Sequence, residues 1–102
     1  MKAKTINLAE LIDYQDGSVV SRQLIKKESG SVTLFAFGKG EGLSEHTAPF
    51  DALVYILDGE AEVFIAKKPL IVKAGQVIIM PANIPHKLKA LDKFKMLLVM
   101  IR

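Results

Sequence analysis

Short segments rich in aliphatic and β-branched residues, each bounded by Gly, Pro, Asp or Lys, run along almost the whole chain. Their nearly regular spacing is typical of an all-β sandwich or barrel, in which each strand ends at a turn before the next begins. One stretch alone has a helical pattern, so helix-based architectures are excluded. The expected strands cover residues 18–26, 31–37, 51–57, 60–66, 70–73, 76–80, 86–91 and 94–101.

The exception lies near the N-terminus, where a short helical turn is predicted. Asn7 is a good N-cap residue, and Glu10 follows three residues later as in a capping box. Leu8, Leu11 and Ile12 then share one face of the turn. The pair Asp16-Gly17 ends it before the first expected strand.

The length and composition of the chain narrow its class. At 102 residues we expect one domain over residues 1–102, and the lack of cysteine excludes disulfide scaffolds, zinc fingers and thiol chemistry. The longest apolar run, 96–101, is far too short for a spanning helix. The basic start, Met1 to Lys4, is followed by an apolar segment that polar residues interrupt, unlike a signal peptide. We therefore expect a soluble cytoplasmic protein without a membrane partner.

Charge is unevenly distributed along the chain. With 14 basic and 11 acidic residues the net charge is only +3, and the basic stretch lacks the interleaved aromatic and Arg residues of a nucleic-acid surface. No nucleic-acid partner is expected. Acidic residues dominate 40–66 and lysines dominate 67–95, which favours strands of opposite charge that attract one another across a sheet.

The pair Asp58-Gly59, between two apolar runs, predicts a two-residue type I′ hairpin. Strand alternation on either side of it separates two faces. The face expected inside the barrel carries Ala52, Val54, Ile56, Ala61, Val63 and Ile65. The outer face carries Leu53, Tyr55, Leu57 and Phe64. Because this outer face is too apolar for free solvent, we expect the N-terminal segment or a second subunit to cover it, and a homodimer is predicted.

The two histidines stand in two spaced patterns. The first is Gly40-x5-His46-x-Ala48-x3-Ala52-x6-Gly59, and the second is Gly75-x5-Pro81-x-Asn83-x2-His86-x3-Ala90. These intervals resemble the two signature motifs of the cupin superfamily, over 40–59 and 75–90. The resemblance implies a small β-barrel of the jelly-roll type with a pocket inside, and it implies that His46 and His86 face that pocket.

The departures from the family pattern concern its metal ligands. Metal-binding cupins use two histidines and a glutamate of the first motif with the histidine of the second, and here Ala48 and Ala52 replace two of these four. His46 and His86 remain as a partial metal site, whereas a mononuclear site usually needs three protein ligands. The neighbouring carboxylates, Glu45, Asp51 and Glu62, are expected to point away from the pocket. We expect at most a weakly bound divalent metal and no certain cofactor.

Strand alternation and the resemblance together predict the ligand-binding residues. They are His46, His86, Ala48, Ala52, Val54 and Leu88. An apolar pocket with two imidazoles is typical of a small-molecule site, so we favour a protein that binds a small organic ligand. Two alternatives stay open. One is a divergent cupin enzyme, dioxygenase-like or isomerase-like, that uses a His-pair metal or metal-free acid–base chemistry; the other is an oligomerisation or sensory module.

Overall fold

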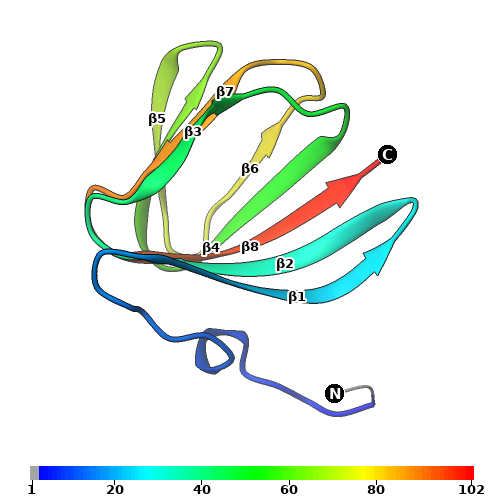
Figure 1. Ribbon diagram of the computed structural model, residues 1–102, viewed down its shortest axis with the longest axis vertical. Coiled ribbons are helices and arrows are strands. Elements are labelled where there is room, and N and C mark those ends of the chain that lie inside the picture. The colour runs from blue at the N-terminus through cyan, green and yellow to red at the C-terminus, as the bar shows by residue number, and fades with distance from the viewer. Residues whose placement is uncertain (1–2) are drawn as a thin grey trace.

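The computed structural model describes residues 3–102 and is almost entirely β-structure (Figure 1). Met1 and Lys2, part of the basic start considered above, lie outside the described residues. Within this range no helix is long and apolar enough to cross a membrane. The elements are the 3₁₀ turn η1 (Leu8–Glu10) and the strands β1 (Val19–Lys27), β2 (Gly30–Phe37), β3 (Gly42–His46), β4 (Asp51–Ile65), β5 (Lys68–Lys73), β6 (Val77–Met80), β7 (His86–Lys89) and β8 (Phe94–Ile101).

The strands form two antiparallel layers that share β4. In the large layer the order is β1-β2-β8-β4-β6, and in the small layer it is β3-β7-β4-β5. Figure 1 shows the sheet curling around a central space, with β3, β5 and β7 facing the large layer. The predicted fold class, a small all-β jelly-roll barrel with a short N-terminal helical turn, is therefore confirmed.

The hairpin predicted at Asp58-Gly59 is wrong, because β4 runs through it as one strand of 15 residues. Instead of folding back, Asp58 and Gly59 continue the pairing with β8, opposite Lys95 and Phe94. The register shifts between Ile56 and Asp58, which leaves Leu57 as the extra residue of a β-bulge. Gly59 has φ +75°, the backbone conformation that a type I′ turn also demands. An Asp-Gly pair is therefore compatible with either a type I′ turn or a bulged strand.

The bulge preserves the predicted separation of faces. One extra residue reverses the in–out alternation, so that even-numbered side chains point inward before the bulge and odd-numbered ones after it. Five of the six predicted interior residues are buried and the sixth, Ile65, is half-buried. The strand β4 ends instead at a two-residue turn of Ala66 and Lys67, which joins it to β5. Both residues have positive φ and lie between the paired residues Ile65 and Lys68.

The predicted outer face is divided between the two layers. Leu57 packs with the cluster formed by Ile12 of the N-terminal segment and the large layer. The N-terminal segment therefore covers this part of the outer face, which was one of the two predicted possibilities. Phe64 lies on the small layer instead, with the ammonium of Lys87 4.8 Å from its ring centroid. The expected pairing of acidic and basic strands is also present in this layer, where Glu62 stands opposite Lys89.

Candidate functional site

The two histidines lie at the ends of neighbouring strands. His46 is the last residue of β3 and His86 is the first residue of β7, and the two are direct partners across this antiparallel pair. The sequence pattern had not predicted β3, since Gly42-Leu-Ser-Glu-His has no β-branched residue. Pairing with β7 makes it a strand, and that pairing brings the imidazoles together.

A tight turn before β7 sets the direction of His86. Asn83 occupies the left-handed region at φ +63°, and its N–H donates to the carbonyl of Ala48 at 2.8 Å. The backbone N–H of Ala82 donates to the Asp51 carboxylate at 2.9 Å. Both bonds tie the turn to the segment after His46, so the two motifs hold each other in place.

The imidazole rings meet through their Nε2 atoms, which are 3.0 Å apart. The ring planes are inclined at 71°. Each Nδ1 atom is hydrogen-bonded to a main-chain carbonyl two residues earlier in the chain. The Nδ1 of His46 lies 2.7 Å from the Ser44 oxygen, and that of His86 lies 3.2 Å from the Ile84 oxygen.

These carbonyl contacts decide which ring nitrogen carries the proton. A carbonyl oxygen only accepts hydrogen bonds, so each Nδ1 must be the N–H of its ring. In the neutral form both Nε2 atoms are then acceptors, and their lone pairs converge on one region. Two facing lone pairs repel each other, so the arrangement is suited to a proton, a cation or a hydrogen-bond donor that both nitrogens can share.

The two histidines differ in their exposure to solvent. His86 is 4% exposed, whereas His46 stands at the exposed edge of the barrel. Burial lowers the pKa of His86, a nearby protonated His46 would lower it further, and the Ile84 carbonyl acts in the opposite direction. His86 is therefore neutral at physiological pH, and its Nε2 is free to accept a hydrogen bond.

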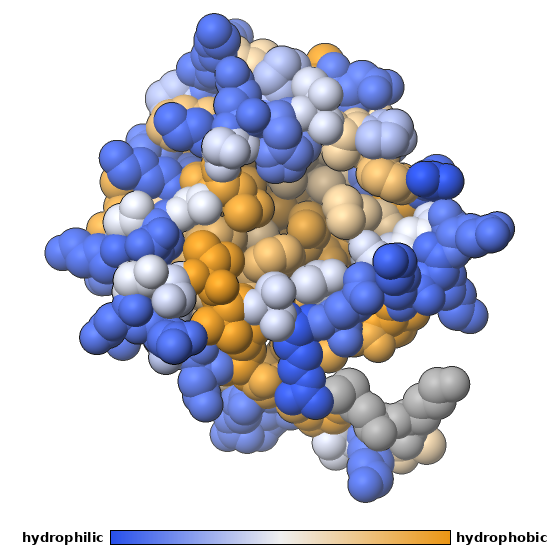
Figure 2. All heavy atoms as spheres, in the orientation of Figure 1, coloured by the Kyte–Doolittle hydropathy of each residue, from blue (hydrophilic) through white to orange (hydrophobic). Residues whose placement is uncertain are grey.

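Behind the pair lies a small apolar cavity of about 40 Å³. Figure 2 shows apolar side chains gathered in the middle of the view, with hydrophilic ones around them. A cavity of this size admits a polar group of one or two atoms but not a whole organic molecule. Its lining is Leu43, His46, Ala48, Ala52, Met80, His86, Leu88, Met96, Leu98 and Met100.

Five of the six predicted site residues line this cavity: the two histidines, Ala48, Ala52 and Leu88. Val54 does not. It is fully buried one step deeper in the core. Two lining residues were not predicted: Leu43, because β3 was not expected as a strand, and Met80. The register could have identified Met80, which is the direct partner of Ala52 across β6 and β4.

The donor set does not fit the metal that the cupin resemblance implies. Within residues 3–102 no group of three or more His, Asp or Glu side chains surrounds a common point. Two imidazoles fall short of the three protein ligands of a mononuclear site. Asp51 is exposed and engaged with the Ala82 N–H, and Glu45 is exposed, so neither supplies a further ligand at the cavity.

Comparison with known proteins agrees with this fold. A family model described as a cupin domain matches residues 33–102. A conserved protein of unknown function from Streptococcus pyogenes is 37% identical, with a TM-score of 0.96 over 100% of this chain and 90% of that one. A cupin 2 conserved barrel domain protein from Leptotrichia buccalis is 46% identical, with a TM-score of 0.93 over 95% of this chain and 47% of that one, so this chain spans about half its length.

A cupin superfamily protein from Desulfitobacterium hafniense is 29% identical, with a TM-score of 0.93 over 99% of this chain and 93% of that one. No curated protein matches the sequence. The match of the family model over more than half of the chain agrees with the two spaced histidine motifs and with the jelly-roll topology. The chain belongs to the cupin superfamily.

Proposed function

We propose that the protein binds a small organic molecule at the barrel mouth, through a hydrogen-bond-donating group that both His46 and His86 accept. One observation carries the proposal: both Nδ1 atoms are engaged with carbonyls, while both Nε2 atoms point at one region from 3.0 Å apart. An ammonium group satisfies two such acceptors with two of its three N–H bonds, and a hydroxyl shares its single O–H between them in a three-centre bond. A carboxylate, which only accepts, does not.

The size and lining of the cavity restrict the ligand further. About 40 Å³ holds the donor group and little more, so the body of the molecule lies outside, at the mouth. Leu43, Leu98 and Met100 around the histidines favour an aliphatic segment next to the donor. The ligand class is therefore an alcohol or amine with an apolar chain. With two imidazole donors, divalent metal ions are expected to bind there only weakly.

The alternative is an enzyme that uses the same pair for metal-free acid–base chemistry. The observation that favours it is the lowered pKa of buried His86 beside exposed His46. A neutral imidazole could take a proton from a bound hydroxyl and pass it to its neighbour, which solvent can reach. Turnover of a bound alcohol in the absence of added metal would favour this alternative over binding alone.

The experiment compares octanol with octyl methyl ether, in which a methyl group replaces the hydrogen that octanol donates. In an NMR titration the ether should bind about tenfold more weakly, the loss expected for one hydrogen bond. His46→Ala should weaken this preference, since only the Nε2 of His86 is left to accept. Glu45→Gln, on the neighbouring exposed residue, should keep it. Equal binding of the two probes, or a preference that is undiminished in His46→Ala, would contradict the proposal.

We also propose that the protein forms a homodimer through the outside of its large layer. Five aliphatic side chains stand in register across all five strands of that layer: Ile25, Val32, Val99, Leu53 and Ile79. Ile25 is 53% exposed and Ile79 is 60% exposed. The row continues the face that the N-terminal segment partly covers, and a two-fold axis can set it against the same row of a second copy.

Light scattering tests the dimer. Ile79→Lys, in the row, should give a monomer at tens of micromolar, whereas Ile71→Lys should leave the dimer intact. Ile71 is a matched control because it is 45% exposed on β5 of the small layer, away from the row. A monomeric parent protein, or dimers in both variants, would refute the assignment of this face.

A further inference from the structure

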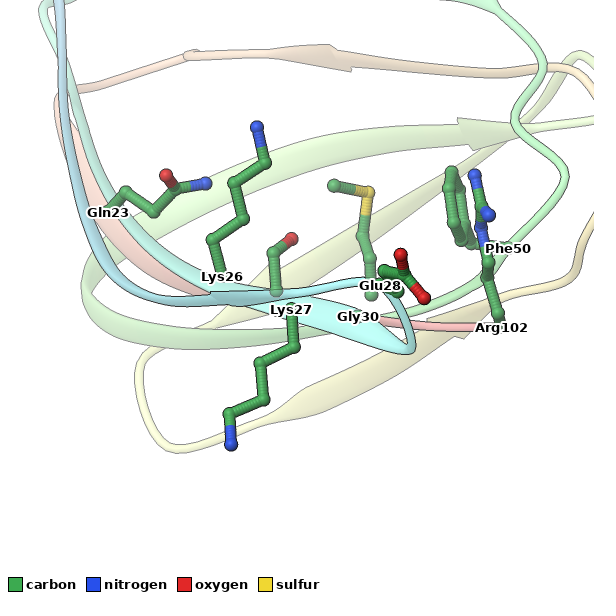
Figure 3. A pocket seen from close by; sticks show the side chains of 9 residues that line it. Gln23, Lys26, Lys27, Glu28, Gly30, Phe50 and Arg102 are labelled. Carbon is green, nitrogen blue, oxygen red and sulfur yellow. The ribbon is translucent and has the colours of Figure 1, made fainter.

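A second, larger hollow of about 430 Å³ adjoins the barrel mouth. It lies between the β1–β2 hairpin, the loop that carries Phe50 and the end of β8 (Figure 3). Its volume is in the range of small-molecule sites, unlike that of the histidine cavity. Met100 lines both spaces, so the two share a wall.

One row of inward-facing residues connects the two spaces. Lys26 is the partner of Ser31, Ser31 of Met100, and Met100 of Ala52. Ala52 lines the histidine cavity, and Lys26 lies three strands away, about 14 Å along the sheet. The row therefore changes from apolar at the histidines, through a hydroxyl, to a cation.

The far end of the row has a second cation. The guanidinium of Arg102 lies 4.8 Å from the centre of the Phe50 ring, and its backbone N–H donates to the Ser29 carbonyl at 2.9 Å. Figure 3 shows Lys26 and Arg102 on the barrel side of the sheet and Lys27 pointing to the opposite side. The charged residues of the lining are Lys26, Lys27, Arg102 and Glu28, so three cations and one carboxylate leave a net charge of +2.

We propose that this groove, with Lys26 and Arg102, binds the anionic end of the molecule whose donor end lies at the histidine pair. This inference rests on the proposed function for the position of the other end. Arg presents a planar fork to carboxylate or phosphate oxygens, and Lys adds a point charge. Phe50 and Met100 supply apolar contact between the ends. The ligand class becomes an aliphatic chain with a hydroxyl or amine at one end and a carboxylate or phosphate at the other.

The test uses octanoate, omega-hydroxyoctanoate and octanol in NMR titrations against the full chain. Octanoate and hydroxyoctanoate should each bind about tenfold more weakly to Lys26→Ala and to Arg102→Ala, as expected for one lost charge-assisted bond. Octanol binding should not change in either variant. Lys68→Ala removes the same charge from an exposed residue of β5 in the small layer, outside the groove, and it should leave all three titrations unchanged.

The outcomes separate this inference from the proposed function. If octanoate binding is insensitive to Lys26→Ala and Arg102→Ala, or equally weakened by Lys68→Ala, the groove assignment is overturned while the octanol result still stands. If octanol binds the parent protein and His46→Ala equally well, the proposed function fails, whatever the result of the octanoate titrations. Replacing octanoate by octyl phosphate tells which anion the groove prefers. Raising the salt concentration should weaken the binding of both anions.

Discussion

Replacing Gly59 by Ala tests the bulge that carries β4 from one layer to the other. A Cβ atom at this position would lie 2.1 Å from the carbonyl oxygen of Lys93 on the way into β8. Real Cβ atoms stay more than 3.0 Å from such an atom, so the β4 and β8 backbones would have to separate. The positive φ of +75° adds a second penalty for any residue other than glycine.

The matched control is Gly40→Ala. Gly40 also has a positive φ, +83°, but nothing lies within 4 Å of its Cβ position. We expect this control to cost about 1–2 kcal/mol in the free energy of unfolding, for the backbone conformation alone. Gly59→Ala should cost about 3–5 kcal/mol, since it adds overpacking against the main chain of a core strand.

Urea unfolding followed by circular dichroism measures both values at equilibrium. The informative quantity is the difference between the two variants, which removes the shared backbone penalty. If Asp58-Gly59 formed an open two-residue turn, both substitutions would cost the same. Equal losses of stability would therefore refute the continuous β4 strand and its pairing with β8 at Asp58 and Gly59.

Three further predictions concern the core and the site. Val54→Asp should cost several kcal/mol in the free energy of unfolding, because it buries a carboxyl without a partner, whereas Glu62→Ala should cost well under half as much by the same urea titration. Burial lowers the pKa of His86 below its unfolded value of about 6.5, so the unfolded state binds a proton first as the pH falls. The free energy of unfolding should therefore decline below about pH 6.5, and a value that does not change with pH would contradict this. Ala48→His with Ala52→Glu should raise the affinity for divalent metal by orders of magnitude in calorimetry, since it restores four ligands, and no gain would show that these positions do not face the pair.

The fold was predictable because hydrophobic alternation is a strong signal, even where the turn was misjudged. Residues 51–65 point the same way in a hairpin and in a bulged strand, so the interior face was right although Asp58-Gly59 was not a turn. The strand β3 could not be predicted from hydrophobic alternation. Its five residues have no alternating apolar pattern, and only pairing with β7 defines them.

The site was predictable to a similar degree. The motif spacing brought His46 and His86 together, but it did not indicate that both Nδ1 atoms are bound to carbonyls. The groove at Lys26 and Arg102 could not be predicted, because those residues meet through the register of β1, β2 and β8, far apart in the sequence. The weak metal affinity, the homodimer and the cytoplasmic location predicted from the sequence stay predictions.

The most direct test of the central claim is the protonation of the two imidazoles, read by long-range proton–nitrogen NMR on protein with ¹⁵N-labelled histidine. At about pH 8 both rings should carry their proton on Nδ1, and both Nε2 nitrogens should resonate as unprotonated acceptors. Adding octanol should then shift both Nε2 signals and leave the Nδ1 signals in place. A ring with its proton on Nε2, or Nε2 signals that do not shift when octanol is added, would contradict the proposed role of the two histidines.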